Sequence, residues 1–169
     1  IGVAASLHDV VSVARRERRP YYSIRLAAPV LDRLLPQFYD TAEAVRIKGE
    51  ILHAIICHQT EEEPLTLEAG VVRVADGLDM ERGRSRVHYE QGGRGINTVS
   101  SQAIERVRLI EGEQRPVLVE IVMTNAAGVY QVDNLLGSKI ADSGLDPYLR
   151  IVAANIADRG ERIVDRLEL

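Results

Sequence analysis

The spacing of apolar residues differs between the two halves of the chain. Up to about residue 90 apolar side chains recur every three to four positions, which is typical of amphipathic helices. This spacing predicts helices within 1–8, 22–39, 41–59 and 67–83. Beyond residue 103 apolar and polar residues alternate, and the alternation predicts a hairpin formed by 104–110 and 117–123.

Turn-forming and polar residues predict where the helices begin and bend. Thr41 is expected to cap the third helix, and Thr66, followed by Glu68, is expected to open the fourth. Pro29 lies inside the second helical pattern, where proline removes a backbone donor, so it predicts a kink or a restart.

The C-terminal part is predicted to combine a small sheet with one helix. GVYQV reads as a short strand, VDNLLGSKIADSG as a helix stopped by Gly144, and YLRIVAANI with RIVDRLEL as a second hairpin. The glycine-rich stretch over 83–101, which precedes the C-terminal part, has no helical period. We therefore expect an α+β protein: an all-helical domain over 1–90, a linker over 91–103, and a small antiparallel sheet with one helix over 104–169.

Composition narrows the class of protein. The 169 residues are 46% apolar and carry a net charge of −4, which is typical of a globular domain and gives no general case for nucleic-acid binding. The single cysteine, Cys57, excludes an internal disulfide framework. No apolar run reaches the roughly 18–20 residues of a membrane span, so we expect a cytoplasmic protein with no membrane partner. Because Ile1 begins within an apolar helical pattern, we expect the natural N-terminus to lie further upstream.

Several histidines and aspartates are candidates for a metal site, which needs ligands from separate elements converging on one point. They are His8, Asp9, His53, His58, Asp76 and Asp79. Neighbouring helical side chains point about 100° apart, so His8 and Asp9 can share an ion only where their helix ends. His53 and His58 lie about 140° apart around a helix, so at most one of them is functional.

Asp76 is conspicuous because it lies within the apolar run VVRVADGLDM. A carboxylate at such a position needs a partner. A metal ion would serve, and so would an ordinary ion pair with Arg73 or Arg82. Each candidate histidine also fits the role of a hydrogen-bonded core residue.

Taken in order, ASLHD and VVRVADGLDMERGRSR resemble the HD superfamily of metal-dependent phosphohydrolases, over about residues 1–90. The chain is similar to stand-alone HD-domain proteins of archaea and some bacteria. The resemblance implies a helical bundle in which His8, Asp9 and Asp76 are catalytic ligands of a divalent metal ion, together with a further histidine upstream of the chain's first residue. IICHQ resembles a histidine-bearing helix of the family, which favours His58 over His53 as an additional ligand. Mn, Mg, Fe, Co and Ni all suit such nitrogen and oxygen ligands.

The resemblance implies hydrolysis of a small phosphorylated substrate, a nucleotide or a phosphodiester, by metal-activated water. Cationic side chains near the ligands would bind the phosphate, and the candidates are Lys48, Arg82, Arg84 and Arg86. A solvated helix end is the alternative role for the three arginines. A basic run near the HD pair is either a cationic segment that guides phosphate toward the site or a charged loop; it consists of Arg15, Arg16, Arg18 and Arg19.

Departures from the family pattern leave two other functions open. Arg19-Pro20 stands where some members carry a histidine, and VVSVARRERR lacks a glycine common after the HD pair. These differences favour a catalytically degenerate regulatory or scaffold protein. ADGLDMERGRSR also resembles the closing helix of membrane-anchored endoribonucleases, which implies an RNA-directed phosphodiesterase. Under the leading hypothesis of a phosphohydrolase, we expect the C-terminal part to serve substrate choice or self-association, including a homodimer.

Overall fold

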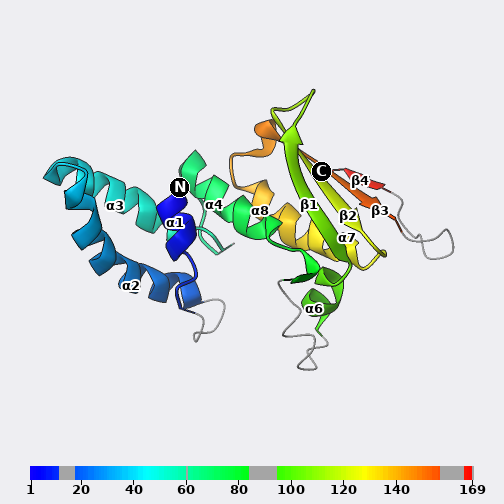
Figure 1. Ribbon diagram of the computed structural model, residues 1–169, viewed down its shortest axis with the longest axis horizontal. Helices are drawn as coiled ribbons and strands as arrows, with labels where there is room; N and C mark the ends of the chain where they lie inside the picture. Colours follow the sequence, from blue (N-terminus) through cyan, green and yellow to red (C-terminus); the bar gives the residue numbers. More distant parts are fainter. Residues whose placement is uncertain (12–17, 60, 84–94, 157–165, 169) are drawn as a thin grey trace. The chain divides into compact units, whose positions relative to one another are not determined.

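The computed structural model describes residues 1–11, 18–59, 61–83, 95–156 and 166–168, and the chain divides into two compact units. One unit comprises Ile1–Asp76 and Asp142–Gly144, and the other comprises Gly77–Ala141 and Leu145–Leu169. The first is helical and the second contains a sheet, so the predicted α+β class is confirmed (Figure 1).

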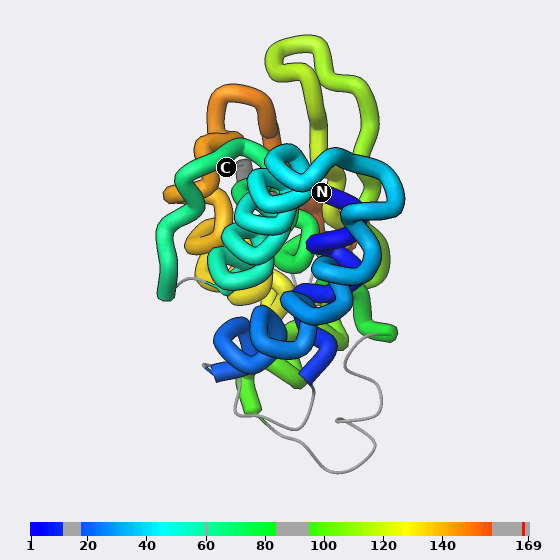
Figure 2. Tube along the Cα trace, turned by 90° about the vertical axis from the view of Figure 1, so that its left-hand side faces the viewer, coloured from blue at the N-terminus to red at the C-terminus, as the bar shows by residue number. Residues whose placement is uncertain are grey.

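The four predicted helices are present, and the helical unit contains all of them except the last two residues of the fourth. They are α1 (Gly2–Leu7), α2 (Arg19–Leu34), which continues into the 3-10 turn η2 (Leu35–Gln37), α3 (Thr41–Ile56) and α4 (Leu67–Leu78). Helix α3 packs against both α1 and α2, as the tube in Figure 2 shows. Their shared core includes Leu31 and Ile55, both fully buried. Burial of one such side chain contributes about 1.5–3 kcal/mol.

The helix ends follow local hydrogen bonding. The N-cap of α3 is Asp40, whose Oδ1 accepts a hydrogen bond from the Glu43 amide at 2.9 Å, so the prediction of Thr41 as cap is wrong by one residue. The prediction for Thr66 is confirmed, because its Oγ1 accepts from the Ala69 amide at 3.3 Å. Helix α2 continues through Pro29 as one element, so no restart occurs there.

The second unit is built around a four-stranded sheet. After α6 (Ile96–Ser101) come β1 (Ile104–Glu111), β2 (Val117–Met123), β3 (Leu149–Asn155) and β4 (Arg166–Glu168), in the spatial order β1-β2-β3-β4. The two predicted hairpin pairings are present, since β1 with β2 and β3 with β4 are antiparallel. However, β2 and β3 are parallel, so the prediction of an antiparallel sheet is wrong and the sheet is mixed.

The parallel pairing follows from the segment between β2 and β3. GVYQV, predicted as a strand, is helical: α7 (Gly128–Tyr130), the π-helical segment η3 (Gln131–Leu136) and α8 (Gly137–Ala141) follow one another. The buried Val132, Leu136 and Ile140 recur every four residues, a helical spacing that a five-residue window cannot reveal. A helical crossover returns the chain to the same end of the sheet, which makes the flanking strands parallel.

The unit boundary differs from the predicted linker over 91–103. The chain divides between Asp76 and Gly77, and 96–101 of the predicted linker form α6, while 84–94 lie outside the described residues. The helix predicted to stop at Gly144 ends at Ala141, and Gly144 has a φ of +72°, a left-handed conformation suited to glycine. Within the described ranges, no helix has the length and apolar character needed to cross a bilayer.

Candidate metal site

Two of the predicted ligands, His8 and Asp76, lie side by side although 68 positions separate them in the chain. His8 is the C-cap residue of α1, and Asp76 lies near the end of α4. Their Nε2 and Oδ1 atoms are 3.5 Å apart, and the side chains are 25% and 7% exposed. The end of α1 allows His8 to turn toward the carboxylate, as the sequence predicts for a helix that stops at the HD pair.

Backbone hydrogen bonds set the orientation of the His8 and His58 rings. The Nδ1 atom of His8 lies 2.7 Å from the Ala5 carbonyl oxygen, and that of His58 lies 2.6 Å from the Ile55 carbonyl oxygen. Such carbonyls near a helix end lack an intrahelical partner and accept a hydrogen bond readily. If Nδ1–H donates, the neutral ring carries its lone pair on Nε2, a tautomer we assign from the hydrogen-bond network.

This tautomer makes the pair of His8 and Asp76 a site for a cation. A lone pair on His8 Nε2 would face a carboxylate oxygen at 3.5 Å, and the two repel each other unless positive charge lies between them. A proton can supply that charge: the hydrogen bond to Asp76 raises the pKa of His8 above its ordinary 6.5, although burial opposes the shift. A divalent metal ion can supply it as well.

Asp9, which follows His8 in the chain, contributes a second carboxylate. Its Oδ2 lies 3.4 Å from Arg19 Nη1 at the start of α2. Its Oδ1 is buried and has no hydrogen-bond partner among the residues that the structure describes. A buried carboxylate oxygen without a donor is costly, and a bound cation would satisfy it.

His58 lies beside the pair, but both of its ring nitrogens have protein partners. The side chain is fully buried, and its ring centroid lies 4.9 Å from that of His8 with the planes at 78°. Nδ1 lies against the Ile55 carbonyl, and Nε2 lies 2.9 Å from the Gln59 amide nitrogen. His58 thus packs against the His8 ring with both nitrogens on protein atoms, and its role as an additional ligand stays a prediction.

His53 has a different environment. Its Nε2 accepts a hydrogen bond from the Leu65 amide at 3.0 Å, and its Nδ1 lies 3.5 Å from Cys57 Sγ. These contacts tie the segment after α3 back to the helix, so His53 has a structural role.

The donor set fits a divalent ion in part. His8 Nε2, Asp76 Oδ1 and the orphaned Asp9 Oδ1 are a nitrogen and two oxygens, which suits Mn, Mg, Fe, Co or Ni. Within the described residues, no group of three or more His, Cys, Asp or Glu side chains is close enough to hold an ion by itself. A metal here would thus need Asp9 to turn or a further ligand to join.

Of the four predicted phosphate-binding cations, only Lys48 and Arg82 lie within the described residues. Lys48 forms a 2.6 Å ion pair with Asp32, so the prediction that it binds phosphate has no support. Arg82 is exposed and belongs to the second unit. Arg84 and Arg86, like Arg15 and Arg16, lie outside the described residues, and Arg18 is exposed.

The sequence did not single out Arg73 as a functional cation. This side chain of α4 is 2% exposed, and its Nη2 donates to the Gln59 carbonyl at 2.9 Å. Its Nε and Nη1 have no hydrogen-bond partner among the described residues, so the sequence-based alternative of a pair with Asp76 is not formed. The signal was present, since an arginine inside VVRVAD is as unusual as the aspartate three residues later.

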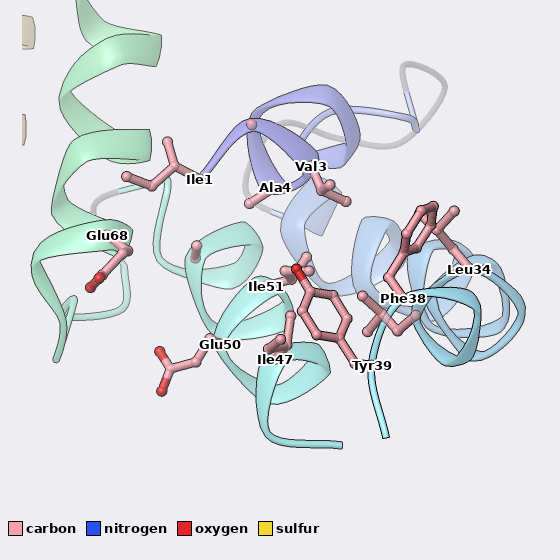
Figure 3. Close-up of a pocket in the computed structure, with 13 residues that line it drawn as sticks. Ile1, Val3, Ala4, Leu34, Phe38, Tyr39, Ile47, Glu50, Ile51 and Glu68 are labelled. Atoms are coloured by element: carbon pink, nitrogen blue, oxygen red, sulfur yellow. The ribbon is translucent and has the colours of Figure 1, made fainter. Parts of the chain in front are cut away.

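A separate cavity of about 540 Å³ lies among α1, α2, η2 and α3 (Figure 3). Its lining is mostly apolar and includes Ile1, Phe38 and Ile51, with Glu50 and Glu68 at its edge (Figure 3). Neither of the two histidines near Asp76 nor Asp76 itself lines this cavity. We therefore assign the candidate chemistry to the His8–Asp76 pair.

Comparisons with known proteins do not assign a function. No family model matches the chain, and no solved structure matches it. It is 37% identical over 151 residues to an uncharacterized protein, MJ1020, of Methanocaldococcus jannaschii. The match covers 89% of this chain but 58% of the relative, so the chain spans somewhat more than half of the relative's length.

Proposed function

We propose that this protein is a metal-dependent phosphohydrolase that cleaves a phosphate ester, with His8, Asp9 and Asp76 as metal ligands. The observation that carries the proposal is the 3.5 Å approach of His8 Nε2 to Asp76 Oδ1. A third potential donor atom, Oδ1 of the neighbouring Asp9, is buried without a hydrogen-bond donor among the described residues. The three donors resemble the ligands of HD-superfamily hydrolases, and their arrangement calls for a cation.

The residues of the chain prepare the site. The hydrogen bond to the Ala5 carbonyl fixes the His8 ring and directs Nε2 toward Asp76. Burial of the Asp76 side chain, which is 7% exposed, keeps competing water away from its carboxylate. The fully buried ring of His58 limits rotation of His8. When bound, a divalent ion would polarise a phosphoryl oxygen and make an attacking water more acidic.

Metal content and hydrolysis measured together test the proposal. We expect the full-length protein to retain about one divalent ion per chain after dialysis, as measured by elemental analysis. Asp76→Ala should lose the ion and lower hydrolysis of p-nitrophenyl phosphate or nucleoside monophosphates by about 100-fold or more, because removal of even a second-shell partner costs 10–100-fold.

Glu68→Gln is the matched control, because Glu68 is an exposed carboxylate on the same helix α4. It should keep both metal and activity. Full metal occupancy in a folded Asp76→Ala variant would contradict the proposal. An RNA oligonucleotide among the substrates tests the phosphodiesterase alternative, whose binding should weaken steeply with salt.

A second candidate function, a regulatory protein without turnover, is favoured by the contact between Arg19 and Asp9. The guanidinium lies 3.4 Å from Asp9 Oδ2 and so competes with a cation for this carboxylate. This function predicts that the protein binds a divalent ion yet hydrolyses no ester in a broad screen. Arg19→Ala should then raise metal affinity, since Asp9 would lose its competing partner.

A further inference from the structure

Arg73 carries a buried positive charge that the described chain leaves largely unpartnered. The side chain is 2% exposed on α4 and makes one hydrogen bond, from Nη2 to the Gln59 carbonyl at 2.9 Å. Its Nε and Nη1 are both buried and have no partner among the described residues. A guanidinium remains charged at any physiological pH, so it cannot relieve this cost by losing a proton.

Such a group ordinarily has an anion beside it. Buried arginines are stable when a carboxylate or phosphate accepts from their remaining N–H groups. No carboxylate in the described part of the chain forms an ion pair with Arg73. The two orphaned donors therefore indicate an oxyanion that comes from outside these residues.

The position of Arg73 links this anion to the proposed metal site. Asp76 follows it by three residues on α4, and side chains at this spacing lie on the same helix face with Cβ atoms about 5–6 Å apart. The residue that accepts from Arg73, Gln59, also bonds Nε2 of His58 at 2.9 Å. His58 in turn packs against His8, so the guanidinium and the His8–Asp76 pair belong to one connected cluster.

We propose that Arg73 is the phosphoryl-binding residue of this site and that its Nε and Nη1 donate to oxygens of the substrate's terminal phosphate. The catalytic part of this inference rests on the proposed function, whereas anion binding by itself does not. Because both donors are buried, an anion that meets them must enter as a small terminal group. The substrate class is therefore a phosphate monoester, such as a nucleoside monophosphate, and not a phosphodiester within an RNA chain.

Thermal unfolding of the full-length protein in EDTA tests anion binding separately from the metal. Inorganic phosphate is the probe, with potassium chloride at equal ionic strength as the reference. Phosphate should raise the Tm of the wild-type protein by several degrees when it is in about hundredfold excess over its Kd. Isothermal titration calorimetry of phosphate supplies that Kd.

Arg73→Met should abolish this shift while raising the Tm in the absence of phosphate, because removal of an uncompensated buried charge in favour of an apolar side chain is often stabilising. Arg73→Lys should keep a reduced shift, because it retains the charge but loses the planar fork. Arg25→Met is the matched control, since Arg25 is exposed on α2, and it should leave the phosphate response unchanged.

Two results would overturn the inference. One is a phosphate response that persists in Arg73→Met. The other is a wild-type protein that inorganic phosphate does not stabilise, and a lower Tm of Arg73→Met would then show that Arg73 has a partner within the protein. Failure of the metal proposal looks different: the phosphate shift in EDTA would remain, but Asp76→Ala would alter neither metal content nor hydrolysis.

Discussion

Two glycines within helices, Gly49 and Gly70, should respond in opposite ways to the same substitution. Gly49 lies in the middle of α3 and Gly70 in α4. A Cβ added at Gly49 would meet no atom within 4 Å, whereas at Gly70 it would lie 2.0 Å from the Ser143 carbonyl oxygen. Only the surroundings differ, so the pair isolates the contribution of the contact with Ser143.

The magnitudes follow from these distances. Alanine is favoured over glycine inside a helix by about 0.5–1 kcal/mol, so Gly49→Ala should raise the free energy of unfolding by about that amount. At Gly70 the Ser143 backbone would have to move by roughly 1 Å, because non-bonded carbon and oxygen atoms stay more than about 3 Å apart. Ser143 is 2% exposed and has little room to move. Overpacking of this kind costs about 1–3 kcal/mol, so Gly70→Ala should be destabilising overall.

Urea unfolding followed by circular dichroism at 222 nm measures both variants, with the m-value as a check that the denatured state is unchanged. We expect the Gly70→Ala protein to be less stable than the wild type and the Gly49→Ala protein to be more stable, roughly 2 kcal/mol apart. Equal stabilisation by both substitutions would refute the reasoning, because it would mean that the segment around Ser143 does not lie against α4 as described.

Two further predictions concern stability. Asp40→Ala removes the carboxylate that accepts a hydrogen bond from the Glu43 amide, so it should lower the free energy of unfolding by about 1 kcal/mol. Thr41→Ala is the control and should change the free energy of unfolding much less. Equal losses in urea unfolding would contradict the assignment of Asp40 as the cap. Burial raises the pKa of the Cys57 thiol above 9.0, an effect that the charge of Arg73 partly offsets. The contribution of the protonated thiol to the free energy of unfolding is therefore constant below pH 9 and is lost as the pH rises further. If a Cys57→Ala variant lost as much stability as the wild type between pH 8 and 10, burial of the thiol would not be the cause.

Helix existence was predictable from the sequence because amphipathic spacing extends over many residues. The exact helix ends and the sheet topology were harder to predict from the sequence. Asp40 and Thr41 both cap helices well, and only the backbone conformation decides between them. The parallel pairing of β2 with β3 depends on the helical crossover over 128–141, and GVYQV is too short to distinguish a helix from a strand.

The candidate site was predictable to the extent that its residues are chemically unusual where they stand. Asp76 within an apolar helical run requires a partner, and the structure brings His8 to it. The same reasoning applied to Arg73 would have found the second buried charge. Lys48 is a different case, because a lysine on a helix has no sequence signal for its partner, and here it pairs with Asp32 on α2.

The return of residues 142–144 to the helical unit has a consequence for how the protein can be divided. The carbonyl of Ser143 fills the space beside Gly70, although 72 residues of chain separate the two. A fragment ending at Asp76 would leave this surface of α4 uncovered and would lack one of its own packing partners. The helical unit thus consists of two separate segments of the sequence, and cleavage of the chain at one position cannot separate the complete unit from the rest of the protein. Its folding can be completed only after the chain has been made through strands β1 and β2 and on to Gly144, or after residues 142–144 have been supplied on a separate peptide.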